Sequence, residues 1–379
     1  MSISRIKRIG NYVLLFLTFV NFANNLNYLL VLTFLWLFLN KKISVRSFDT
    51  LTSTCFIIFC FTYIAFGSAY LSVSTIPSWA CAFVIGYSIV KKNDDVLPVL
   101  SVVALGLLAE GVLTIFLSPS FTMDSSGDRF FNSIWNGQQR PGTAQDCSFY
   151  MYSACAFYLA GHDRVKLPFK VFFVVLAFYF VFDSLVTATR SVLLYCTIIL
   201  FFAYFIKNRI TKFSSFSIVI FFIVIIYVCY LSNVFGIKTI FGDSFLFQRI
   251  VNGDDGGVMH NSRLGSWNTF FDHWMDFPLG GLRHANKISF MHNILLDTYA
   301  SAGIFTSLAL LIIILRNLLF VFRSYRRSNN ITKYLLPSCF LSFILVFNSE
   351  PIIESSHSFF AAYLFFVGVV CKYNSLNNI

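Results

Sequence analysis

The chain is short of charge: Asp, Glu, Lys and Arg make up 12% of its 379 residues, whereas hydrophobic residues make up 57%. Soluble domains carry roughly 25% charged residues, so an ordinary water-soluble fold is excluded. Nine cysteines are present, but no two form a CxxC pair, which argues against a zinc site or a disulfide framework. The sequence also lacks HExxH, GxGxxG, Walker and GxSxG motifs. We therefore predict neither a metal ion nor a cofactor.

What the chain has instead is a series of apolar runs between Tyr12 and Val370, separated by short polar clusters. Because a helix needs about 20 apolar residues to cross the hydrocarbon core, the pattern predicts an all-α polytopic membrane protein. It would have about twelve transmembrane helices in a single transmembrane domain over residues 1–379. The predicted spans are 11–22, 27–40, 51–70, 73–90, 96–118, 146–161, 168–185, 190–206, 214–235, 291–315, 334–349 and 356–371. One kinked helix remains an alternative for the first pair, because Asn21 to Asn27 shortens both spans.

The net charge of +11 is distributed as a topology signal and not as a patch for nucleic acid. Most Lys and Arg residues cluster in short loops, which stay on the cytoplasmic side of a membrane. Both termini are then cytoplasmic, and the outer side holds a first loop at 119–145 and a large loop at 236–290. Against the usual bias, the outer side also carries basic residues: Arg129, Arg140, Arg190, Lys238, Arg249, Arg263, Arg283 and Lys287.

The large loop contains the segment SRLGSWNTFFDHWMDFPLGG, in which four apolar residues recur at helical spacing: Leu264, Trp267, Phe271 and Trp274. Pro278 and the glycines that follow end this pattern. The segment predicts an amphipathic helix that lies in the headgroup layer. Such a helix would hold Arg263 near the membrane surface.

The apolar run from Ser289 to Ile314 opens with a histidine and an asparagine. In a straight helix, eleven residues come within about 20° of three full turns. One stripe would then carry His292, Leu295, Leu296, Tyr299 and Gly303. A histidine can take a proton near neutral pH, the asparagine can hydrogen-bond beside it, and the glycine lets a neighbouring helix approach. An interfacial histidine satisfied by headgroups, above a glycine that serves only packing, is the alternative.

Two arginines outside the large loop are further candidates. Arg190 stands at the outer end of a predicted span, where a half-buried arginine is costly unless it pairs with an anion. Its planar fork of donors matches phosphate oxygens, although an arginine that snorkels to anchor a helix end is also compatible. Arg140 lies in the polar segment NGQQRPGTAQDC just before a span. That cluster suggests contact with a sugar or a phosphate, and an ordinary loop is the alternative.

These motifs resemble those of one known superfamily. HNILLDTYASAGIFT, residues 292–306, is similar to the H-[NSQ]-x9-G-x-x-[GTY] pattern of O-antigen ligases, and RSVLL, residues 190–194, is similar to their R-x3-L element. Residues 261–281 resemble an outer-loop segment of the O-antigen ligase/polymerase superfamily, in which an arginine is followed by a tryptophan and later by Pro-Leu-Gly. The order of the motifs and the predicted topology agree over essentially the whole chain.

The resemblance implies a multi-pass glycosyltransferase of the bacterial inner membrane, with its active site facing the periplasm. Its donor would be an oligosaccharide linked to undecaprenyl pyrophosphate. The acceptor would be a second lipid-linked repeat unit in a polymerase, which we favour, or lipid A core in a ligase. Membrane lipid and a chain-length regulator are further expected partners, and nucleic acid is not.

The resemblance also implies roles for particular residues. His292 would act as the general base on the acceptor hydroxyl, and Arg190 and Arg263 would stabilise the departing pyrophosphate. The expected substrate-binding residues are Asn293, Arg140, Arg249, Arg283 and Tyr299. A flippase or transporter of lipid-linked oligosaccharides is the alternative from another class. Transporters usually show repeat symmetry and charged residues deep within spans, whereas here the polar residues gather on one side.

Overall fold

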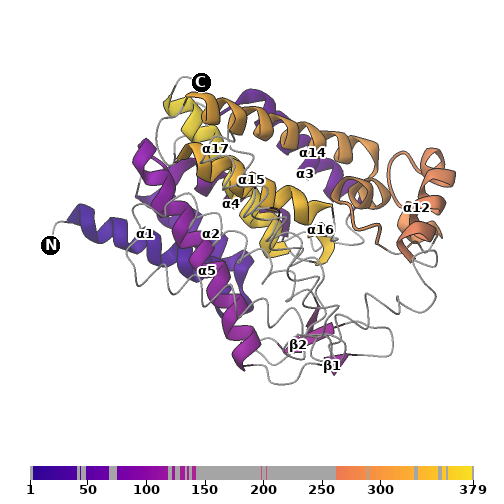
Figure 1. Cartoon of the computed structure of the whole chain (residues 1–379), viewed down its shortest axis with the longest axis horizontal. Coiled ribbons are helices and arrows are strands. Elements are labelled where there is room, and N and C mark those ends of the chain that lie inside the picture. The colour runs from indigo at the N-terminus through magenta and orange to yellow at the C-terminus, as the bar shows by residue number, and fades with distance from the viewer. Residues whose placement is uncertain are drawn as a thin grey trace, which may run out of the picture.

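The structure, a computed structural model, describes residues 3–40, 43, 48–67, 75–117, 122–123, 129–132, 135, 139–141, 198, 202, 262–286, 288, 290–327, 332–348, 352–355 and 357–377. These residues are helical apart from connecting turns and three short strands (Figure 1). The main helices are α1 (Ile3–Phe19), α2 (Leu26–Leu39), α3 (Thr50–Phe66), α4 (Thr75–Ile89), α5 (Val96–Leu117), α12 (Ser262–His273), α13 (Leu282–Asn286), α14 (Ile294–Arg327), α15 (Thr332–Phe347), α16 (Ile352–Ser355) and α17 (His357–Leu376). Short 3-10 turns occur at Phe22–Asn24, Asn93–Asp95 and Trp274–Asp276.

Each predicted span that falls within the described ranges coincides with a helix, namely α1 to α5, α14, α15 and α17. Among the described residues, two helices are long and apolar enough to cross a membrane: α14, with a mean hydropathy of 2.4, and α17, with 1.5. The helices α2, α3, α4 and α15 are apolar but shorter. The predicted spans 146–161, 168–185, 190–206 and 214–235 lie outside the described residues, apart from Ile198 and Phe202.

The first apolar stretch forms two helices. A 3-10 turn with left-handed backbone at Asn21 (φ 49°) and Ala23 (φ 56°) reverses the chain between α1 and α2. The two helices then pack side by side, with a buried contact of 3.1 Å between the hydroxyls of Thr18 and Thr33. The alternative of one kinked helix is therefore wrong.

The α1–α2 turn also receives an acidic side chain from the predicted span 96–118. Glu110 of α5 is only 3% exposed, and it accepts a hydrogen bond of 3.1 Å from Nδ2 of Asn21. Because Asn21 belongs to the turn that connects α1 to α2, the carboxyl group of Glu110 lies toward one end of the bundle and not at its middle. Its burial beside an amide fits the rule that carboxyl groups inside apolar helices take hydrogen-bonding partners.

The tightest helix contact in the core joins α4 to α17. Gly86 and Gly368 face each other across it: a Cβ atom at Gly86 would meet the carbonyl oxygen of Phe365, and one at Gly368 would meet the backbone of Phe83 and Tyr87. The absence of side chains at both positions lets the two backbones approach closely, as in helix pairs packed within membranes. Of the two long apolar helices among the described residues, α17 is the more enclosed, with 83% of its 18-residue apolar stretch buried.

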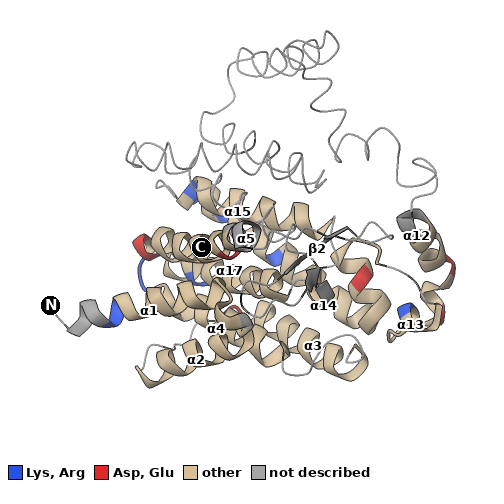
Figure 2. Ribbon diagram, turned by 90° about the horizontal axis from the view of Figure 1, so that it is seen from below, with Lys and Arg blue, Asp and Glu red and all other residues tan. Residues whose placement is uncertain are grey.

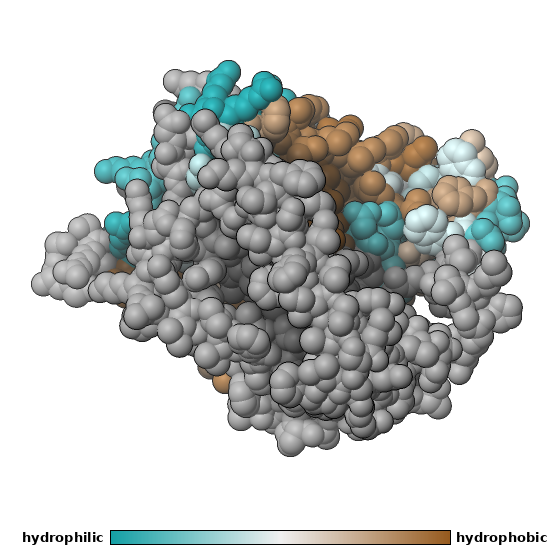
Figure 3. Space-filling model, in the orientation of Figure 1, coloured by the Kyte–Doolittle hydropathy of each residue, from teal (hydrophilic) through white to brown (hydrophobic). Residues whose placement is uncertain are grey.

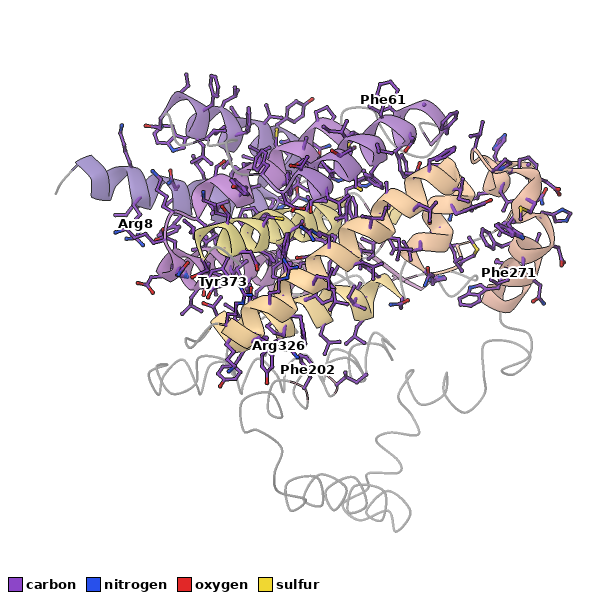
Figure 4. The ribbon with its side chains drawn as sticks, turned by 90° about the horizontal axis from the view of Figure 1, so that it is seen from above. Arg8, Phe61, Phe202, Phe271, Arg326 and Tyr373 are labelled. Atoms are coloured by element: carbon purple, nitrogen blue, oxygen red, sulfur yellow. The ribbon has the colours of Figure 1, made fainter. Side chains whose placement is uncertain are left out.

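The bundle has two ends that differ in charge and in connectivity. At one end, Arg8 of α1 forms an ion pair of 3.1 Å with Asp95, and Asn93 and Asn377 exchange side-chain hydrogen bonds of 2.7 and 3.1 Å. α12 lies at the other end, so that Phe271 stands far from Arg8 (Figure 4). Most of the ribbon between them lacks charged residues (Figure 2). Segments that the charge pattern assigns to one side of a membrane are thus joined at one end.

One face of α14 is apolar and exposed. The part of α14 after the break at Gly303, residues 304–327, extends about 36 Å at 1.5 Å per residue, beyond a hydrocarbon core of about 30 Å. The structure therefore extends the predicted span, which ended at residue 315, through the basic cluster to Arg327. Its outward side chains form a continuous apolar surface (Figure 3): Phe305, Leu308, Ile312, Leu315, Leu318, Leu319 and Phe322.

The described residues confirm the all-α class, with one small antiparallel sheet beside the helices. It consists of β1 (Thr122–Met123), β2 (Arg129–Asn132) and β3 (Gln139–Pro141), in the order β1-β2-β3, within the predicted first outer loop at 119–145. Arg140 pairs with Phe131 across the second strand pair. Strands this short fall below the length at which alternation of apolar and polar residues gives a signal, so the sequence did not indicate them.

At the junction of α3 and α14, the N-cap residue Asp49 accepts hydrogen bonds from both Thr52 and Arg316. The Nη2 and Nε atoms of Arg316 donate to its two carboxylate oxygens at 2.8 and 3.2 Å, and the backbone N–H of Thr52 donates at 3.0 Å. Burial by itself would raise the pKa of Asp49, but the hydrogen bonds from Arg316 and Thr52 outweigh it and lower the pKa below its ordinary value. The pair ties the start of one long helix to the second half of another.

Because the pKa of Asp49 is lower in the folded state, its contribution to stability is present above the unfolded pKa of about 3.9 and is lost as the pH falls through the folded value. We expect Asp49→Ala to lower the free energy of unfolding by about 1 kcal/mol at pH 7. In unfolding measurements on purified protein in detergent, the difference from wild type should shrink toward pH 3. A difference that stays constant with pH would contradict the lowered pKa.

Replacing a glycine at the α4–α17 contact should separate the two helices. We expect Gly86→Leu to lower the free energy of unfolding by about 1–3 kcal/mol, because the side chain would displace backbone and not a flexible side chain. Gly265→Ala is a suitable control, since a Cβ atom there meets nothing within 4 Å. Thermal unfolding of both variants in the same detergent would test this. A midpoint for Gly86→Leu equal to that for Gly265→Ala would show that the close approach of the two helices is not required.

Candidate functional site

His292 is not part of the α14 helix. The helix begins at Ile294, and His292 lies two residues before it with a left-handed backbone (φ 55°). The prediction of one straight stripe that includes His292 and Gly303 is therefore wrong, because the helical path is interrupted at both residues. A left-handed conformation costs a residue other than glycine roughly 1–2 kcal/mol. Such strain persists only where the surrounding structure imposes it.

Asn293 caps the start of α14. Its Oδ1 accepts hydrogen bonds from the backbone N–H groups of Leu295 and Leu296, at 3.1 and 3.2 Å. Its Nδ2 donates to Oδ1 of Asn348, at the end of α15, at 2.9 Å. This side chain therefore satisfies helix N–H groups that have no partner within the helix and links two elements beside His292. Its role as a substrate ligand stays a prediction.

The backbone around His292 is held by Asp297, which the sequence analysis did not single out. The Oδ1 atom of Asp297 accepts from the N–H of Met291 at 2.9 Å, and Oδ2 accepts from the N–H of Asn293 at 3.1 Å. One carboxylate thus bonds the N–H groups of the residues before and after the histidine. An acidic residue in the first turn of a helix was the available signal, because carboxylates there accept from free N–H groups.

Arg283 pairs with this carboxylate. Its Nη2 lies 2.6 Å from Oδ1 of Asp297, and both side chains are nearly enclosed, with 8% and 7% exposed. The guanidinium group also lies over the ring of Phe290, 4.3 Å from its centre. Arg283 was predicted to bind substrate, but the structure places it in the interior, where it neutralises Asp297. Its charge is used within the protein because a buried carboxylate needs a compensating cation.

Gly303 breaks α14, and the Pro-Leu-Gly segment fills the break. With φ 84° and ψ 179°, Gly303 has a conformation that is essentially restricted to glycine. The N–H of Ile304 donates to the carbonyl of Pro278 at 2.9 Å, and the carbonyl of Ser301 accepts from Gly281 at 3.2 Å. A Cβ atom on Gly303 would run into the backbone of Leu279. The glycine does permit close packing, as predicted, but what approaches is this loop and not a neighbouring helix.

The predicted amphipathic helix is present as α12, followed by the 3-10 turn Trp274–Asp276. Trp267 donates its indole N–H to the carbonyl of Met291 at 2.9 Å, which fastens α12 to the residue before His292. Phe270 is buried, at 3% exposed, whereas Phe271 of the predicted apolar stripe is 56% exposed (Figure 4). The buried side of the helix is therefore rotated away from part of that stripe.

Tyr299 packs under α12. Its hydroxyl donates to the carbonyl of Trp274 at 2.6 Å, and its ring lies edge-on to Phe270, with ring centres 5.2 Å apart. Only 6% of the residue is exposed. The structure thus gives Tyr299, a predicted substrate-binding residue, a packing role that joins α12 to the first part of α14.

The remaining predicted residues are described only in part. Arg190 and Arg249 lie outside the described residues, and so do residues 236–261 of the large loop. Arg140 is the middle residue of β3, and Arg263 is the second residue of α12, one helical turn before Trp267. Within the described ranges, no three His, Cys, Asp or Glu side chains are placed to share a metal ion.

Comparisons with protein-family models and with curated proteins found no match to this chain.

The strain at His292 and the fit at Gly303 predict opposite responses to substitution. His292→Gly should be more stable than His292→Ala by about 1 kcal/mol, because only glycine adopts φ 55° without penalty. Gly303→Ala should be less stable than wild type by about 3 kcal/mol, because it adds both strain and a backbone clash. Unfolding midpoints of the three variants, measured in one detergent, would test this order; a His292→Ala protein as stable as His292→Gly would contradict it.

Proposed function

We propose that the protein is a glycosyltransferase of the O-antigen polymerase type in a bacterial inner membrane. It transfers a glycan from undecaprenyl pyrophosphate to a sugar hydroxyl at the periplasmic face, in the synthesis of lipopolysaccharide. The proposal includes about twelve transmembrane helices with both termini in the cytoplasm. The motif order in residues 190–194, 261–281 and 292–306 supports it.

The single observation that carries the proposal is the contact between α12 and the His292 segment. Trp267 donates to the carbonyl of Met291, so α12, whose second residue is Arg263, is fastened next to His292. Trp267 and Met291 are 24 residues apart in the sequence, yet one hydrogen bond joins them. His292 is half-buried and held in a strained backbone, as is frequent for residues that act on a substrate.

In the proposed reaction, the oxygen of the acceptor hydroxyl attacks the anomeric carbon of the donor glycan. The bond from that carbon to the pyrophosphate oxygen breaks, and the pyrophosphate lipid leaves with the electron pair. His292 takes the proton of the hydroxyl, which makes the oxygen a better nucleophile. Arg190 and Arg263, with Arg140 and Arg249 as further donor ligands, stabilise the negative charge on the leaving group.

Substitutions should separate chemistry from folding. We expect His292→Ala and Arg190→Ala to abolish glycan transfer while the protein remains in the membrane, and Arg263→Ala to weaken use of the donor. Arg190→Lys should restore little, because a single ammonium group cannot reproduce the planar fork. His273→Ala is the matched control, since this histidine is exposed on α12. Long-chain lipopolysaccharide, viewed on gels beside immunoblots of membranes, reports both properties; an unchanged ladder in the His292→Ala strain would exclude proton transfer by this residue.

A deletion strain distinguishes the possible acceptors. Loss of a polymerase leaves lipid A core that carries a single repeat unit. Loss of a ligase leaves bare core, with polymer accumulating on the carrier lipid, and the histidine pattern of residues 292–306 favours this second candidate. A strain with unchanged lipopolysaccharide would refute both and would favour another glycan pathway or a transporter.

A further inference from the structure

The described residues next to His292 include a carboxylate whose bonds are directed at the backbone of that segment. Asp297 accepts from the N–H groups of Met291 and Asn293, which flank the histidine, at 2.9 and 3.1 Å. The two bonds use different oxygens of the carboxylate, so the peptide plane that follows His292 and the plane that precedes Met291 are fixed to one rigid group. The plane between Met291 and His292 is held by the bond from Trp267 to the carbonyl of Met291, so the backbone on both sides of the histidine, which sets the direction of its side chain, is fixed.

The carboxylate is itself held firmly. Arg283 donates to Oδ1 at 2.6 Å, and the pair is almost wholly enclosed, so water does not compete for the oxygens. Because α13 supplies Arg283 and α14 supplies Asp297, the position of His292 depends on the docking of the large loop onto α14.

From this geometry we infer that Asp297 is a positioning residue for His292. Its carboxylate brackets the histidine through the N–H groups of the residues on either side, holds the left-handed backbone, and directs the imidazole toward the acceptor hydroxyl. The role in transfer rests on the proposed function, whereas the bracketing of the backbone does not. Arg283 serves this arrangement by neutralising the carboxylate of Asp297, and it is not a ligand for the donor.

The variant Asp297→Asn tests the bracket. The amide keeps the shape of the side chain but turns one acceptor oxygen into a donor that faces another N–H, so one of the two peptide groups is released. We expect the rate at which diethylpyrocarbonate modifies His292 in purified full-length protein, followed by mass spectrometry, to rise at least threefold. The rates at His273 and His284, which are exposed, should stay unchanged. Asp272→Asn, an exposed position on α12, is the matched control.

In a reconstituted transfer reaction, Asp297→Asn should lower kcat at least tenfold and change the KM for the lipid-linked donor by less than threefold. A loss that came only from misfolding would reduce the amount of active protein and would not change the modification rate of His292 selectively.

A second variant separates positioning from charge neutralisation. The double substitution Arg283→Met with Asp297→Leu removes both buried charges together, which proteins often tolerate. It also removes the bracket, so transfer should remain at the level of Asp297→Asn even where the protein accumulates normally. Recovery of transfer to near the wild-type rate would overturn the inference, because Asp297 would then only balance Arg283.

The remaining outcomes are also decisive. An unchanged modification rate of His292 in Asp297→Asn would overturn the bracket. Failure of both Asp297 variants to accumulate, while Asp272→Asn accumulates, would assign Asp297 to folding and overturn its positioning role. If Asp297→Asn speeds the modification of His292 but the wild-type protein shows no glycan transfer, the bracket stands and the proposed function is refuted.

Discussion

The break in α14 at Gly303 is the constraint on which the structure around His292 depends. Breaking a helix inside an apolar protein leaves backbone groups without partners, and each such group is costly when water is excluded. Here the chain itself supplies the hydrogen-bonding partners, which are the carbonyl of Pro278 and the N–H of Gly281. The break and the loop that fills it therefore stabilise each other. Once this join forms, the first turns of α14, α13 and α12 are held as one body, and the segment with His292 is part of it.

A second principle concerns how charge is used in an apolar bundle. The ion pair of Asp49 with Arg316 and that of Asp297 with Arg283 lie toward opposite ends of α14, and each joins this helix to another segment of the chain. Neither pair adds much stability by itself, since removing charges from water offsets the attraction between them. They contribute mainly specificity, because a displaced register would leave a charge buried without its partner.

Much of the fold was predictable from the sequence, because apolar runs bounded by basic clusters are strong signals for helices. His292 and Asn293 were also recognisable as candidate site residues, since a polar pair at the start of an apolar run is unusual. What could not be predicted is local geometry that depends on distant residues. The left-handed backbone of His292 is imposed by Asp297, and the break at Gly303 is filled by a loop more than twenty residues earlier. The contacts of Arg283 could not be predicted, because an arginine in a loop suggests exposure, and only the folded chain shows the carboxylate with which it pairs.

The join between the Pro-Leu-Gly segment and α14 is made by main-chain atoms, so it places few demands on side-chain identity apart from the glycines. The body formed by α12, α13 and the first turns of α14 and the long helical shaft, residues 304–327, can therefore diverge at different rates during evolution. Changes on the surface of α12 would alter the exposed face of that body without repacking the shaft against α3 and α17. A scaffold divided in this way can acquire a new surface at one end while its apolar frame stays constant.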